Sequence, residues 1–446
     1  MGDFFKAIFG ALTGPLVIVL GILIMLYMFN TIGVNIQPFL AVAIALTPIW
    51  LPLVLFYVTY DRWIEFVHAK FRVDNPRVTL RIKLPPEVFK SPETMESVFT
   101  HVHAANGADN LMQAYLDGKH PLVASYELVS IGGDVRFYIN VHKKIKNMLE
   151  SQLYAVYPGI EIIEELVDYA AEVRWDESKM DLMSFHIVKK ADDIYPIKTY
   201  IEFGHDRLPK EEEKFEPMAA LLEHLGRAKP HERLWVQILC TPHAKKEFKG
   251  GSRHKKGTWE GDAGKKINEI LKRDERKMSA EEETEQRPTL TMGEKDSVTA
   301  MERNVTKLAY ETAIRAMYIT LDKEKFDGGM IGPMLGSFKQ YGILGRNELG
   351  PRWKTEFDYA IFEDRNGRKQ ARRKRDELEA YKARSYDPGG GKQAEGHRAK
   401  IMSTEELATI YHIPGSSVIT PNLGRIESKR RAAPGNLPIG IPPHQS

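Results

Sequence analysis

The chain has 446 residues, enough for two or three domains, and it carries 63 Lys and Arg residues against 60 Asp and Glu residues. A net charge of +3 on so long a chain does not by itself indicate a nucleic-acid-binding protein. The single cysteine, Cys240, excludes an intrachain disulfide and a zinc site made of several cysteines.

Two apolar runs near the N-terminus, at residues 7–29 and 38–60, predict a transmembrane hairpin. Each run exceeds the roughly 20 residues that cross a hydrocarbon core of ~30 Å, and Pro48 and Pro52 predict a kink in the second helix. Basic residues flank the hairpin on both sides, which favours cytoplasmic placement of the N-terminus and of everything after the hairpin. We therefore expect a multi-pass inner-membrane protein in contact with membrane lipid. Three aromatic residues fit the membrane interface: Tyr57, Tyr60 and Trp63.

The predicted hairpin and a juxtamembrane helix occupy residues 1–76, and a first α+β domain is predicted at residues 77–180. Val78, Leu80 and Ile82 alternate with polar residues, as in a strand. A helix follows Ser91, and two strands meet at Gly132-Gly133, a pattern typical of a hairpin. A second helix at residues 143–157 and a strand at 160–166 complete the order β-α-β-β-α-β. This order is that of a ferredoxin-like antiparallel sheet.

Residues 181–343 predict a second α+β domain of related topology. Strands are expected at 184–189, 198–203, 234–238 and 310–320, with helices at 218–225, 297–308 and 331–341. A charged insertion at 244–295 interrupts this domain and contains one predicted short helix near 265–277. The fold class expected is α+β, with a transmembrane hairpin, two ferredoxin-like domains and an irregular tail.

Residues 344–446 predict a basic tail rich in Pro and Gly. Residues 365–384 hold nine Lys and Arg against three Asp and Glu. This run is interpreted either as a patch for nucleic acid or anionic lipid, or as a solvated helix with ion pairs four residues apart. The candidate contact residues are Arg368, Lys369, Arg372, Arg373, Lys374 and Arg375. Ser403 and Glu406 have capping-box spacing, and the helix that they predict places Leu407, Ile410 and Tyr411 as candidates for docking a partner.

No motif indicates catalysis. The glycine-rich stretch that begins at Gly261 lacks the first Gly of a phosphate-binding loop, and it has Lys266 where Ser or Thr is needed. His101 and His103 are two residues apart on a predicted helix and so point to different faces. We expect a protein that is not an enzyme, with no catalytic residue, cofactor or metal.

Several segments together resemble a known bacterial family. They read LPPE at 84–87, KSPETME at 90–96, GGDVRFY at 132–138, LESQLYAVYP at 149–158, YPIKTY at 195–200, LWVQI at 234–238, TEELAT at 404–409 and NLP at 436–438. The chain thus resembles, over most of residues 14–440, the membrane-anchored region that precedes the ATPase domain in type IV secretion and conjugative-transfer-like proteins of bacteria with reduced genomes.

The resemblance implies a part in a machine that translocates DNA or protein. In longer relatives the tail leads into a motor domain, whereas here the chain stops at Ser446. The function expected is a non-catalytic, membrane-anchored platform that docks a separate translocation ATPase and other secretion-system subunits, as a homo-oligomer. The alternative is a membrane-tethered nucleic-acid-binding protein that contacts DNA through its basic tail.

Overall fold

The computed structural model describes residues 37–85, 90–103, 107–205, 215–243, 246–249, 252–255, 259–271, 291–356, 364, 367–386 and 399–415. The chain divides into two compact units, Met1–Lys70 and Phe71–Ser446. The second unit is an α+β structure with a large antiparallel sheet.

The predicted transmembrane hairpin is wrong. Within the described residues no helix is both long enough and apolar enough to span a bilayer. The second apolar run is broken at Leu46 into α2 (Gln37–Ala45) and α3 (Thr47–Asp74), because Pro48 has no N–H to donate to the carbonyl of Ile44. The apolar part of α3, residues 47–60, is only about 21 Å long at 1.5 Å per residue, against the ~30 Å required.

The expectation of a multi-pass inner-membrane protein with cytoplasmic domains is contradicted by the same finding. The first apolar run, residues 7–29, lies outside the described residues.

The first half of the sheet has the predicted β-α-β-β-α-β order. Its elements are β1 (Arg77–Lys83), α4 (Pro92–Val102), the short α5 (Leu111–Tyr115), β2 (Ala124–Ile131), β3 (Asp134–His142), α6 (Lys143–Val156) and β4 (Glu161–Glu165). The strands are antiparallel in the order β4-β1-β3-β2, which is the ferredoxin-like arrangement. The β2–β3 turn is at Gly132 and Gly133, which adopt φ of 60° and 94°.

The second half repeats this order. It consists of β5 (Asp181–Lys189), α7 (Ala219–Gly226), β6 (Glu232–Pro242), β9 (Ala309–Thr320), α11 (Ile331–Lys339) and β10 (Leu349–Lys354), with the strand order β10-β5-β9-β6. The strand predicted at 198–203 is a turn instead. The insertion contributes a small hairpin, β7 (Lys246–Lys249) and β8 (Ser252–Lys255), and the helices α8 (Trp259–Ile270) and α10 (Met292–Val305).

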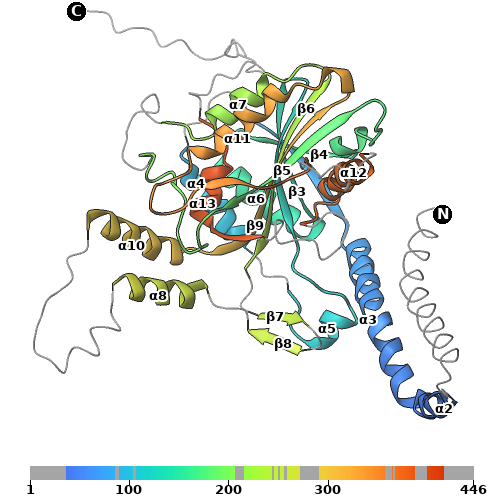
Figure 1. Ribbon diagram of the computed structural model, residues 1–446. Helices are drawn as coiled ribbons and strands as arrows, with labels where there is room; N and C mark the ends of the chain where they lie inside the picture. The colour runs from blue at the N-terminus through green and yellow to red at the C-terminus, as the bar shows by residue number, and fades with distance from the viewer. Residues whose placement is uncertain are drawn as a thin grey trace, which may run out of the picture. The chain divides into compact units, whose positions relative to one another are not determined.

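The two halves are joined edge to edge through β2 and β6. These strands pair antiparallel from Ala124 opposite Cys240 to Ile131 opposite Arg233. The segments 77–180 and 181–343, predicted as two domains, therefore share one sheet within one compact unit (Figure 1).

Helices cover both faces of the shared sheet. The cluster of α4, α6, α7, α11 and α13 (Thr404–Ile410) packs on one face, where the main hydrophobic core lies. The 3-10 helix η1 (Tyr169–Glu172) and α12 (Arg368–Lys382) pack on the other face (Figure 1). β11 (Lys400–Ser403) pairs with the start of β9. The segment predicted as an irregular tail thus supplies β10, α12, β11 and α13 to the fold.

Candidate nucleic-acid interface

The basic run forms helix α12, whose beginning is fixed by a nearby acid. The Asp364 carboxylate accepts hydrogen bonds from the backbone N–H groups of Lys369 and Gln370, at 3.0 and 2.9 Å. Gly367 precedes the helix with φ of 65°, a left-handed conformation that favours glycine. Of the two interpretations of this run, one expected a solvated helix; the run is helical, but one face of the helix is buried. The six candidate cations can therefore be placed on its faces.

The six predicted contact residues do not share one face of α12. Arg368, Lys369, Arg372 and Arg375 are exposed. Arg373 is half-buried, and Lys374 is buried, with its ammonium 2.6 Å from Asp181 and 3.5 Å from Glu356. The helical period of 3.6 residues explains the split, because positions 368, 372 and 375 fall on one stripe whereas 374 points toward the sheet.

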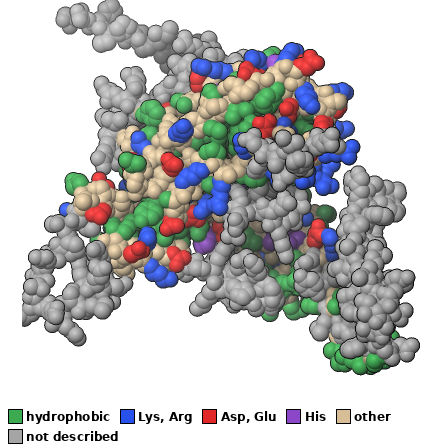
Figure 2. All heavy atoms as spheres, in the orientation of Figure 1, with side chains coloured by type: hydrophobic (Ala, Val, Ile, Leu, Met, Phe, Trp, Pro, Cys, Tyr) green, Lys and Arg blue, Asp and Glu red, His purple; other side chains and the backbone are tan. Residues whose placement is uncertain are grey.

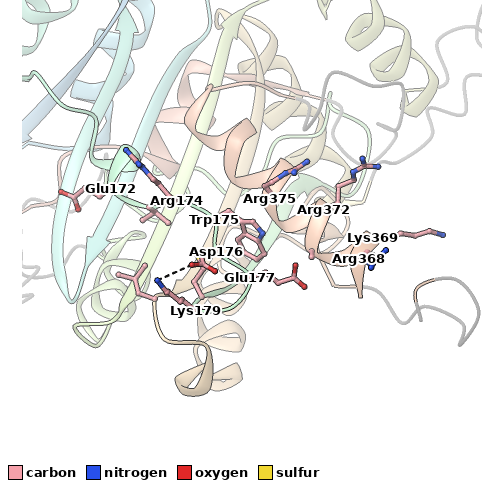
Figure 3. Close-up of a pocket in the computed structure, with 14 residues that line it drawn as sticks. Glu172, Arg174, Trp175, Asp176, Glu177, Lys179, Arg368, Lys369, Arg372 and Arg375 are labelled. Carbon is pink, nitrogen blue, oxygen red and sulfur yellow. Dashed lines mark ion pairs between the residues drawn. The ribbon is translucent and has the colours of Figure 1, made fainter. Parts of the chain in front are cut away.

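The exposed stripe of α12 forms one wall of a groove of about 1100 Å³. The other wall is the segment 172–180, which begins at the last residue of η1 (Figure 3). Its charged lining residues are Arg174, Lys179, Arg368, Lys369, Arg372 and Arg375, with Glu172, Asp176 and Glu177. Cations thus outnumber acids by six to three in this lining, and Figure 2 shows Lys and Arg side chains gathered over α12.

Few of these cations are neutralised by neighbours. Lys179 lies 3.7 Å from Asp176, and Arg375 lies 3.1 Å from Asp376. Within the described part of the chain, the remaining four lining cations form no ion pair; these are Arg174, Arg368, Lys369 and Arg372. Arg375 pairs with the adjacent Asp376 and not with Glu379, which lies four residues along the helix and pairs with Lys382. The groove therefore presents a positive surface suited to phosphate groups.

Trp175 is the aromatic residue that lines this groove among the described residues. Its indole is half-buried and packs at the edge of the cluster that contains Val173 and Met180. Trp175 was not among the predicted site residues because it lies almost 200 residues before the basic run, which itself contains almost no aromatic residue. Its flanking cation, Arg174, is a local signal that was available in the sequence.

A buried polar row fixes the inner face of α12 to the sheet. Glu127, Gln237, Arg315 and His186 lie opposite one another across β2, β6, β9 and β5. Glu377 of α12 accepts from the Arg315 Nε and contacts the His186 Nε2, each at 2.6 Å. All of these side chains are buried. The row therefore gives α12 a single register on the sheet.

A second ion pair fixes the end of α12. Arg384 donates from Nε to the Glu127 carboxylate at 3.0 Å and also pairs with Asp168. Burial opposes ionisation of Glu127, but the charge and hydrogen bonds of Arg384 outweigh it and hold the pKa of Glu127 below its usual range. Burial likewise disfavours the charged form of Arg384, and the charge of Glu127 still raises its pKa well above the usual value. Both groups stay charged.

The other predicted site residues lie elsewhere. Leu407, Ile410 and Tyr411, expected to dock a partner, are buried in the main core and present no surface. The capping box between Ser403 and Glu406 is confirmed, and it begins a helix that is buried throughout. Tyr57, Tyr60 and Trp63 lie on α3, and their assignment to a membrane interface stays a prediction.

No group of three or more His, Cys, Asp or Glu residues in the described ranges is arranged to hold a metal ion. The polar groups that converge beneath α12 pair with one another, whereas the groove beside them is open to a ligand.

The fold and the groove define an α+β protein made of two βαββαβ halves in one sheet, with a cationic surface helix on the face opposite the main core. Residues 67–341 match the family described as Domain of unknown function (DUF8128), and the chain belongs to this family. The match covers both halves of the sheet up to the end of α11 and stops before α12. No curated protein matches the chain.

Proposed function

We propose that this protein binds nucleic acid, without catalysing a reaction on it, in the groove between α12 and residues 172–180. The observation that carries the proposal is the set of four exposed cations that α12 contributes to the groove. Three of them form no ion pair within the described residues: Arg368, Lys369 and Arg372. Phosphates that bind such a stripe release condensed counterions, which favours association. The buried ion pairs beneath α12 support the proposal because they hold the stripe in place before a ligand arrives.

The setting proposed for this binding is a DNA- or protein-translocating machine in which a separate ATPase supplies the motor. Its support is the resemblance of the sequence to secretion and conjugative-transfer proteins. Because Leu407, Ile410 and Tyr411 are buried, docking of an ATPase must use another surface. Co-purification of the full chain from its native cell tests this role, and repeated recovery without any translocation ATPase contradicts it.

Nucleic-acid binding is tested with the full-length chain and the double variant Arg368→Gln/Arg372→Gln. A matched control, Arg227→Gln/Lys265→Gln, removes two exposed cations that lie outside the groove. Binding of a fluorescent oligonucleotide is measured by anisotropy at several salt concentrations. We expect the groove variant to bind more weakly. We also expect the slope of the logarithm of its binding constant against the logarithm of salt concentration to become shallower by about 0.7 for each lost contact to a single strand.

Equal affinities of the groove variant and the control would show that the groove is not the binding site. Tighter binding to vesicles of anionic lipid than to any nucleic acid would also contradict the proposal.

A further inference from the structure

The two walls of the groove carry different charges. The α12 wall contributes Arg368, Lys369, Arg372 and Arg375 and no acid, so its lining charge is +4. The facing wall contributes two cations and three acids, so its lining charge is −1. Phosphates are therefore attracted to one wall only.

Trp175 is on the wall that does not attract phosphates. It lines the groove together with Arg174, and in Figure 3 its indole is drawn between Arg174 and Arg375. An aromatic ring beside a row of cations is the arrangement found where proteins hold unpaired strands, since the cations bind the backbone and the ring stacks on a base. We infer that the groove takes single-stranded nucleic acid, with its phosphates along α12 and a base stacked on Trp175.

A duplex fits this groove less well for two reasons. Its bases are paired in the interior, so Trp175 gains no stacking partner unless a base is flipped out. A duplex also carries about one charge per 1.7 Å, twice the density of one strand, and presents phosphates on both sides. Glu172, Asp176 and Glu177 would then face phosphates across the groove and repel them.

The cationic stripe has a length suited to a short stretch of strand. From Arg368 to Arg375 it extends about 10 Å along the axis of α12. Only a few phosphates of one strand can lie along this distance, so one stacked base makes a large contribution to the total affinity. This inference rests on the proposed function and adds the class of ligand.

The inference is tested with three probes that are 20 nucleotides long and carry the same fluorescent label. They are oligothymidylate, a DNA duplex, and an abasic single strand with the same number of phosphates and no bases. Wild-type protein should bind oligothymidylate more tightly than the duplex. It should bind the abasic strand roughly 5- to 150-fold more weakly than oligothymidylate, and this factor corresponds to the loss of one stacked base. The abasic comparison uses unaltered protein and therefore does not depend on the folding of a variant.

Variants of Trp175 localise the effect. Trp175→Ala should weaken binding of oligothymidylate by a similar factor and leave binding of the duplex unchanged, whereas Trp175→Phe should retain most of the preference. Trp63→Ala removes an exposed tryptophan on α3, outside the groove, and should change neither affinity.

Equal binding of the abasic strand and oligothymidylate would overturn the inference, as would a Trp175→Ala variant that loses affinity for both single strand and duplex alike. In either case a loss of binding in Arg368→Gln/Arg372→Gln would still support the groove as a nucleic-acid site, so the two proposals fail separately.

Discussion

Glu377 of α12 and Arg315 of β9 form an ion pair of 2.6 Å between two side chains that are at most 2% exposed. Removal of one partner leaves the other charge buried and uncompensated, which typically costs about 3–5 kcal/mol. We therefore expect Glu377→Gln to lower the free energy of unfolding by that amount, as measured by urea denaturation. Because the pair holds α12 in place, oligonucleotide affinity should fall in the same variant.

The control for this prediction is Glu379→Gln, two residues along the same helix. Glu379 pairs with Lys382 at 2.9 Å, but its side chain is 59% exposed. Surface pairs of this kind contribute about 0–1 kcal/mol, so the control should be close to wild type. Equal destabilisation of the two variants would show that burial of the Glu377 pair has no special effect.

The pH dependence of stability should contain a contribution from Glu127. Its pKa in the folded protein lies below the reference value of 4.5, since Arg384 outweighs the effect of burial. A carboxyl group with a lowered pKa stabilises the folded state above about pH 4.5. This stabilisation is lost as the pH falls below that value and the carboxylate becomes protonated. Unfolding free energies measured between pH 7 and pH 3 should fall more steeply for wild type than for Glu127→Gln. Parallel curves would contradict this assignment.

Cys240 should be inert while the protein is folded. The thiol is fully buried on β6, and burial raises its pKa well above the usual range. We expect no reaction with a thiol reagent in native buffer and complete reaction in denaturant, with the absorbance of the released chromophore as the measurement. Rapid reaction in native buffer would show that β6 opens readily.

Gly132 should tolerate no side chain. It has φ of 60°, and an added Cβ would lie 3.0 Å from the Cα of Pro230. Gly132→Ala should therefore destabilise the protein by more than about 1 kcal/mol, because both the backbone conformation and the close contact oppose it. Gly336→Ala is the matched control: it lies inside α11 with nothing within 4 Å of the added atom, and it should stabilise by roughly 0.5–1 kcal/mol. Thermal denaturation of both variants distinguishes the two effects.

Local patterns predicted the elements of the first half because each has a clear signal of its own. The alternation from Val78 and the Gly132-Gly133 turn depend on neighbouring residues, and so does the capping box at Ser403, outside the first half. β10 was missed because it is short and contains Pro351 and a bulge next to it. The joining of the halves through β2 and β6 is a contact between residues about 100 positions apart, and no local pattern encodes it.

The candidate site was predicted only in part for the same reason. The basic run was recognised, but which cations face outward depends on what lies beneath the helix. Gln237 and Arg315 are buried on the sheet beneath α12, and no pattern within the basic run shows that α12 covers them. Trp175 lines the groove because the fold places residues 172–180 beside α12, although the two segments are almost 200 residues apart in the chain. The apolar run at 38–60 predicted a membrane span with a kink at Pro48 and Pro52, whereas the chain is broken at Leu46 into two helices.

The place of α13 in the chain has a consequence for biosynthesis. Its buried side chains pack against α4 of the first half, and Thr404 donates a hydrogen bond to Glu96 of α4 at 3.3 Å. Some 300 residues separate these two helices, and at 5–20 residues per second a ribosome needs about 15–60 s to make them. During that interval α4 has no cover from α13, so the nascent chain exposes an apolar surface for which a chaperone is the natural temporary partner.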